Sequence, residues 1–74
     1  MAWFSLDSGG TPTNPLDYTL QSGTPSGCNG TDQICAIQAT DNAGQPVLSA
    51  ALKDEMINAL HTRTPSTNVQ LKVA

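Results

Sequence analysis

With 74 residues, a net charge of −3 and only 12% charged residues, the chain is a single small domain that draws most of its polarity from uncharged side chains. A domain of this size buries only about 60–65% of its unfolded surface, so its core needs support from a disulfide, a metal or a partner. Its fixed cations, Lys53, Arg63 and Lys72, are too few to neutralise a nucleic-acid backbone or to bind an anionic membrane. No apolar run approaches the ~20 residues of a membrane span.

The N-terminal residues predict the first strand. Residues 2–6, AWFSL, are β-prone and would place Trp3 and Phe4 on opposite faces. One aromatic ring is expected to pack on a helix, and the other to mark a binding or assembly surface. The stretch SGGTPTNP consists of residues typical of turns and loops. Residues 16–20 then predict a short strand with Leu16, Tyr18 and Leu20 on one face.

The two cysteines close the sequence CNGTDQIC, and the glycines at positions 27, before the pair, and 30, inside it, favour a tight loop. A disulfide between Cys28 and Cys35 is the favoured interpretation, and a pair of buried thiols is the alternative. A zinc site wants about four ligands, and a redox pair favours C-x-x-C spacing with a nearby cation. The same loop contains an Asn29-Gly30-Thr31 glycosylation sequon, so we expect it to be exposed.

The second half of the chain predicts a strand, a turn, a helix and a final strand. Residues 34–40 are the strand and 41–44 the turn, with residues that tolerate positive φ. Residues 47–61 predict the helix, with Ser49 as a candidate N-cap and one apolar stripe. Residues 67–73 alternate cleanly, as a half-buried antiparallel strand does. The stripe comprises Leu48, Ala51, Leu52, Met56, Ala59 and Leu60.

These elements predict a small α+β domain spanning 1–74, in which a short antiparallel sheet is packed by one helix and stapled by one disulfide. Its parts would be a loop-rich region 1–27, the disulfide loop 28–35, the helix 47–61 and the strand 67–73.

The ionisable residues show no catalytic or metal-binding pattern. His61 is expected at the surface near the end of the helix, where positive charge suits the dipole. Asp54 and Glu55 are adjacent on a helix and diverge by about 100°, so both are expected to be solvated rather than paired. We therefore predict no catalytic residue, no metal ligand and no cofactor. Four aspartates are expected to stabilise turns, and their spacing does not match a calcium-binding loop. They are Asp7, Asp17, Asp32 and Asp41.

Four segments resemble the small secreted Bacteroidota proteins of unknown function, which carry a signal peptide, a short Thr-, Gly- and Asn-rich mature region and a cysteine pair. They are WFSLD at 3–7, NPLDYTL at 14–20, CNGTDQICAI at 28–37 and LKDEMINAL at 52–60. The resemblance implies export, but no activity and no site residues. The N-terminus MAWFSLDSGG lacks the regions of a signal peptide, so either the protein is cytosolic or the chain is a mature secreted form to which Met1, or Met1 and Ala2, was added. The expected disulfide favours the mature secreted form.

The sequence therefore predicts a non-catalytic secreted or cell-surface interaction protein, located outside the cell or in the periplasm, because disulfides persist in oxidising compartments. The alternative is a structural subunit that assembles into an extracellular filament or oligomer through its terminal β-strands. The expected partner is another protein or a second copy of the chain, not a nucleic acid. The candidate interaction surface comprises Trp3, Phe4, Val69, Leu71 and Val73.

Overall fold

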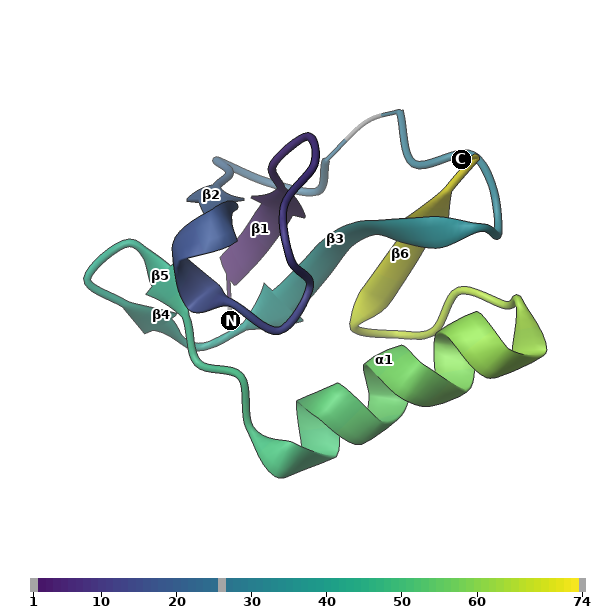
Figure 1. Ribbon diagram of the computed structural model, residues 1–74. Coiled ribbons are helices and arrows are strands. Elements are labelled where there is room, and N and C mark those ends of the chain that lie inside the picture. Colours follow the sequence, from purple (N-terminus) through teal and green to yellow (C-terminus); the bar gives the residue numbers. More distant parts are fainter. Residues whose placement is uncertain (1, 26, 74) are drawn as a thin grey trace.

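A four-stranded antiparallel sheet organises the computed structural model, which describes residues 2–25 and 27–73 (Figure 1). Its spatial order is β2 (Tyr18–Leu20), β1 (Ala2–Leu6), β3 (Gln33–Ala39) and β6 (Val69–Lys72). One helix, α1 (Ala50–Thr62), packs on one face of this sheet. A short hairpin of β4 (Asp41–Asn42) and β5 (Gln45–Pro46) links the sheet to the helix. The predicted α+β class, with one helix on an antiparallel sheet, is confirmed.

The hydrophobic core lies between the sheet and α1. Strand alternation turns Phe4 toward the helix and Trp3 toward the opposite face, as the sequence predicted, and Phe4 has no exposed surface. The predicted stripe on the helix is confirmed at Leu52 and Met56, although Ala51 is exposed. The buried core residues are Phe4, Tyr18, Ile34, Ile37, Ala39, Leu52, Met56, Ala59, Val69 and Leu71.

The helix begins three residues later than predicted. The backbone N–H of Val47 donates to the carbonyl of Thr40 at 3.0 Å, so residue 47 still belongs to the end of the hairpin. Ser49 is the N-cap, because its side chain accepts a hydrogen bond from the Leu52 N–H at 3.1 Å. At the other end Arg63 adopts a left-handed conformation with φ of 53°, and this stops the helix.

The predicted strand at 16–20 is shorter than expected. Residues Pro15–Asp17 form a 3₁₀ turn, η1, because Pro15 fixes its φ and Asn14 accepts a hydrogen bond from the Leu16 N–H at 3.0 Å. Leu16 is consequently 68% exposed and does not share the face of Tyr18, so that part of the prediction was wrong. Tyr18 is buried, and its hydroxyl donates to the Pro12 carbonyl at 2.6 Å.

The predicted turn at 41–44 is the tip of the β4–β5 hairpin. Ala43 and Gly44 both have positive φ, 54° and 88°, as a two-residue hairpin turn requires. The Asp41 carboxylate supports the turn by accepting a hydrogen bond from the Gly44 N–H at 2.7 Å. Asp41 therefore has the turn role that the sequence predicted.

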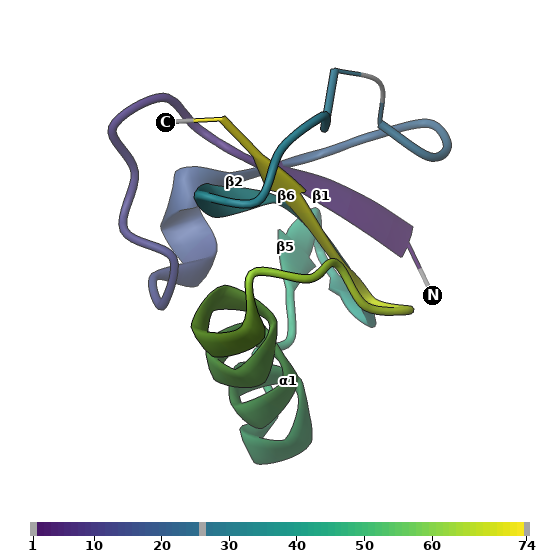
Figure 2. The same ribbon diagram turned by 90° about the vertical axis from the view of Figure 1, so that its right-hand side faces the viewer.

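The loop between β2 and β3 forms a third layer on the sheet face opposite α1 (Figures 1 and 2). A disulfide joins Cys28 to Cys35 with their Cα atoms 5.6 Å apart, as predicted, and Cys35 occupies a β-bulge in β3. Ala36 is completely buried but does not belong to the core cluster under the helix. Gly30 packs so closely on β6 that a Cβ there would lie 2.2 Å from the Val73 nitrogen.

Candidate functional site

The five residues predicted as an interaction surface fall into two groups. Phe4, Val69 and Leu71 are completely buried in the core, so the expectation that their side chains form a surface is corrected. Trp3 is half-buried on the sheet face away from α1, and Val73 is 64% exposed at the end of β6. Of these five residues, only Trp3 and Val73 therefore offer side-chain contacts to another molecule.

The N-terminal strand offers no open edge. β1 pairs with β2 on one side, where Phe4 faces Leu20, and with β3 on the other, where Phe4 faces Ile37. The expectation that this terminal strand could add to a neighbouring sheet is therefore wrong. The edges of the four-stranded sheet are β2 and β6. Of these, only β6 is a terminal strand.

Most of the ionisable groups have structural roles or lie in solvent. Asp17 accepts a hydrogen bond from the Thr11 N–H at 2.8 Å, and Asp7 accepts one from the Thr19 hydroxyl at 2.6 Å, which fixes the loop between β1 and β2. Burial, and secondarily the negative charge of Asp17, raises the pKa of Tyr18 above its ordinary value. His61 is exposed at the end of α1, as predicted.

Asp32 and Arg63 form a 3.4 Å ion pair at the surface, which contributes little to stability because both side chains are exposed to water. Within residues 2–25 and 27–73, no group of three or more His, Cys, Asp or Glu side chains could hold a metal ion.

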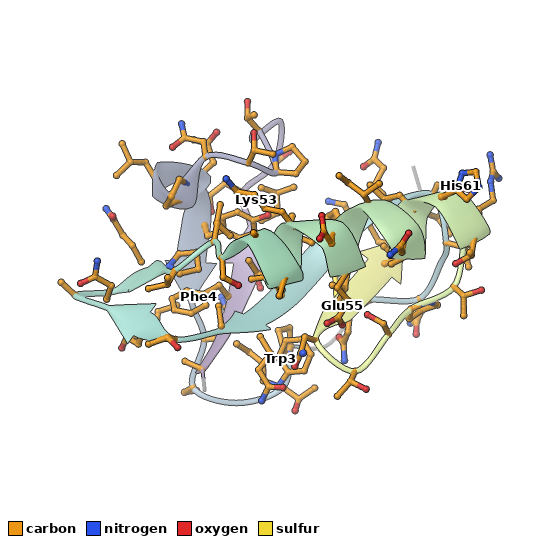
Figure 3. All side chains as sticks on the ribbon, turned by 90° about the horizontal axis from the view of Figure 1, so that it is seen from below. Trp3, Phe4, Lys53, Glu55 and His61 are labelled. Atoms are coloured by element: carbon orange, nitrogen blue, oxygen red, sulfur yellow. A yellow bond between two sulfur atoms is a disulfide. The ribbon has the colours of Figure 1, made fainter. Side chains whose placement is uncertain are left out.

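Glu55 is the exception, and its predicted solvation was wrong. Figure 3 shows it projecting from α1 on the side opposite Lys53. Its carboxylate accepts hydrogen bonds from the Ser66 hydroxyl, from the Asn68 backbone N–H at 2.8 Å and from the Asn68 side-chain amide at 3.1 Å. One carboxylate thus fastens the helix to the turn that precedes β6. Asp54, one residue earlier, is exposed as predicted.

The surroundings of Glu55 stabilise its ionised form. Partial burial raises the pKa of its carboxyl group, but the hydrogen bonds from Ser66 and Asn68 together outweigh burial and hold the pKa below its usual value. Glu55 is therefore a charged acceptor at neutral pH. Each of its hydrogen bonds is charge-assisted and stronger than a bond between neutral groups.

The turn that Glu55 holds covers the beginning of the outer edge of β6. The Ser66 N–H donates to the Val69 carbonyl at 2.9 Å, and the Val69 N–H donates to the Ser66 carbonyl at 3.4 Å. Since both backbone groups of Val69 are directed to Ser66, they point away from β3. Ser66 therefore occupies the position that a neighbouring strand would take.

The rest of the β6 edge follows from strand alternation. The carbonyls of Asn68 and Lys72 point inward, because they accept hydrogen bonds from the Gln38 and Asp32 N–H groups at 2.8 and 3.0 Å. Between Asn68 and Lys72, the backbone groups of successive residues point alternately toward β3 and away from it. Those of Leu71 therefore point outward, as those of Val69 do. The outward backbone groups that Ser66 does not occupy are thus those of Leu71 and the N–H of Val73, and Gly30 packs against the peptide that contains this N–H.

A pocket of about 200 Å³ lies beside the first half of α1, with Glu55 and Asn68 in its lining. Gln38 also lines this pocket and is the register partner of Trp3 in the β1–β3 pair. Besides Glu55, the polar residues in its lining are Thr40, Ser49, Gln38 and Asn68, which carry hydroxyl and amide groups. Such groups hydrogen-bond a partner, but they do not provide a matched acid and base.

No known protein family, curated protein or solved structure matches the chain. In the part of the chain that the structure describes, no helix has the length and apolar character needed to span a membrane.

Replacing Glu55 with glutamine should destabilise the fold most at neutral pH. Because folding lowers the pKa of Glu55, its ionised form stabilises the native state above the unfolded pKa of about 4.3. That contribution is lost as pH falls through the lower, folded pKa. The gap in unfolding free energy between wild type and Glu55→Gln, measured by urea denaturation, should therefore narrow in acid.

The neighbouring carboxylate provides the control for this pH series. Asp54→Asn should change the unfolding free energy by no more than about 0.5 kcal/mol at any pH, because Asp54 is exposed. A Glu55→Gln gap of the same size at pH values above and below the Glu55 transition would contradict the expected role of the charge.

Proposed function

We propose that the protein is a non-catalytic extracellular interaction or accessory protein that binds a protein partner beside Trp3. The observation that carries this proposal is a half-buried tryptophan facing Gln38, which also lines the pocket at the start of α1. Tryptophan is enriched among the residues that dominate binding energy at protein interfaces. Gln38, the register partner of Trp3 on β3, is uncharged, which suits an interface, where charged residues are depleted from the centre.

An extracellular location is supported by the Cys28–Cys35 disulfide, since such bonds are rare in reducing compartments. The composition adds support, because secreted surface proteins often replace charge with hydroxyl and amide groups. Export as a small protein of the Bacteroidota type, which the sequence resemblance implies, is part of this proposal.

A non-catalytic role is supported by what the carboxylates do. Glu55, Asp17, Asp7 and Asp41 each accept a hydrogen bond that holds a turn or a helix in place. Catalytic acids and bases instead converge on a space that a substrate could occupy. Substrate turnover that His61→Ala abolishes, in a broad hydrolase screen, would overturn this part of the proposal.

The interaction can be tested by placing a photoreactive phenylalanine analogue at position 3 and exposing the protein to the surface of the cells that secrete it. We expect one predominant covalent adduct, identified by mass spectrometry. The same analogue at position 57 is the matched control, because Ile57 is also apolar and lies exposed on α1. Equal adduct patterns from the two positions would argue against a partner at Trp3.

A purified partner then permits a quantitative test. Trp3 is the only tryptophan in the chain, so its fluorescence reports burial directly. Binding should shift its emission to shorter wavelength, and Gln38→Ala should weaken the affinity at least about fivefold, as expected for a residue near the centre of an interface. Unchanged emission on saturation would place the interface elsewhere.

A structural subunit that assembles through its terminal strands is the second candidate. It is favoured by the position of β6, which is both the last strand of the chain and an edge of the sheet. It is opposed by the Ser66–Val69 bridge, since a covered edge discourages pairing with another chain. We therefore expect the native protein to sediment as a monomer over a wide concentration range.

A further inference from the structure

The contacts of Glu55 connect α1 to the turn that covers part of the outer edge of β6. We propose that Glu55 is a latch that keeps this edge closed to a second copy of the chain, and that releasing the latch permits antiparallel β6–β6 pairing. The inference goes beyond the binding of a different protein at Trp3. It concerns β6, which pairs with β3 on the side opposite β1, and its partner is a second copy of the chain.

The latch acts through the turn at residues 66–68. Glu55 binds the side chain of Ser66 and both the backbone and the side chain of Asn68, so it holds the residues on either side of Thr67. Ser66 in turn occupies the outward N–H and carbonyl of Val69. Without the carboxylate, the Ser66–Val69 bridge keeps only its own two backbone hydrogen bonds, one of them as long as 3.4 Å.

The sequence of β6 suits pairing with itself. An antiparallel pair centred on Leu71 places Leu71 opposite Leu71 of the second copy, Gln70 opposite Lys72, and Val69 opposite Val73. Lysine thus meets an uncharged amide rather than another lysine, which avoids the repulsion of like charges directly across a sheet. A register shifted so that Lys72 faces Lys72 would incur that repulsion.

The closed latch blocks this pairing at a specific position. In the Leu71-centred register, the outward backbone groups of Val69 bond to Val73 of the second copy, and Ser66 already occupies them. A closed edge can therefore form only the central Leu71 pair. Opening the latch adds the Val69–Val73 pairs on both sides and brings the exposed Val73 side chain against the neighbouring strand.

The test compares Glu55→Ala with Asp54→Ala, which removes the adjacent, exposed carboxylate from the same helix. Sedimentation velocity of both variants and of the wild type should be measured across concentration at neutral pH. We expect Glu55→Ala to form a reversible dimer with at least about tenfold tighter self-association than the other two proteins. Folded Glu55→Ala that stays monomeric wherever the wild type does would overturn the proposal.

A second variant distinguishes dimerisation through the β6 edge from association caused by partial unfolding. Proline at position 73 removes the outward N–H of an exposed residue without altering the core, so Glu55→Ala with Val73→Pro should return to a monomer. Dimerisation that persists in this double variant would contradict the β6–β6 register.

If Glu55→Ala does not fold, Glu55→Gln and Ser66→Ala weaken the latch more gently. In those variants amide hydrogen exchange should accelerate at least about tenfold at Val69, whose N–H points outward, and much less at Gln70, whose N–H points toward β3. Equal acceleration at the two residues, or none at Val69, would show that Glu55 does not control the edge.

Discussion

Replacing Phe4 with alanine should remove a large share of the free energy of unfolding of the protein. Phe4 has no exposed surface and lies on β1 between β2 and β3, so its loss empties the centre of the core. Truncating a buried phenylalanine costs about 3–5 kcal/mol. That cost is comparable with the total stability of a domain this small, which is about 4–11 kcal/mol.

The control for this experiment is Leu16→Ala, which removes a similarly large apolar side chain from an exposed site on η1. It should change the unfolding free energy by no more than about 0.5 kcal/mol. Urea denaturation followed by circular dichroism measures both variants. Equal stability losses at Phe4 and Leu16 would contradict the assigned core.

Removing the disulfide should have the next largest effect. Replacing both Cys28 and Cys35 with alanine frees a ring whose closure restricts the unfolded chain, and the expected loss is about 2.5 kcal/mol. The midpoint of urea unfolding should fall accordingly. A reductant should lower the midpoint of the wild type toward that of the double variant and leave the double variant unchanged.

Two observations would contradict this prediction. One is alkylation of both thiols in the native, unreduced protein, which would show that the cysteines are not bonded to each other. The other is a double variant as stable as the wild type, which would show that the ring does not support the fold. The expected loss is a large share of the stability available to 74 residues.

Local patterns in the sequence were sufficient to predict several elements. The spacing of Leu52 and Met56 identified the buried side of the helix, and Ser49 was correctly proposed as its N-cap, although the predicted start at residue 47 was three residues early. Alternation identified the last strand, and the cysteine spacing identified the disulfide. Each of these features depends on residues that are close together in the chain, so periodicity, capping and loop closure suffice to find them.

The missed features depend on contacts between distant residues. Glu55 was expected in solvent because its helix neighbours offer no partner, whereas its partners Ser66 and Asn68 come from the turn beyond the helix. The edge status of β1 also depends on pairing, since β3 lies nearly thirty residues further along the chain. No periodicity within β1 reveals that it will be flanked on both sides.

The candidate interaction surface mixes exposed and buried side chains for the same reason. Alternation correctly placed Trp3 and Phe4 on opposite faces of the first strand. It could not show that the last strand contributes buried side chains to the core while its backbone forms an edge of the sheet. Val69 and Leu71 are buried as side chains, while their backbone groups point outward. An edge formed by backbone groups cannot be recognised from the residue types of the strand, because nearly all residues carry the same backbone groups.

The ring closed by Cys28 and Cys35 also determines how the molecule responds to a cut by a protease. Asn29, Thr31 and Asp32 are exposed within the ring, so an enzyme can reach the backbone there. A single cut between the two cysteines converts the protein into two chains that the sulfur–sulfur bond keeps together. A single cut in the exposed stretch at 22–24, outside the ring, instead leaves two fragments with no covalent connection.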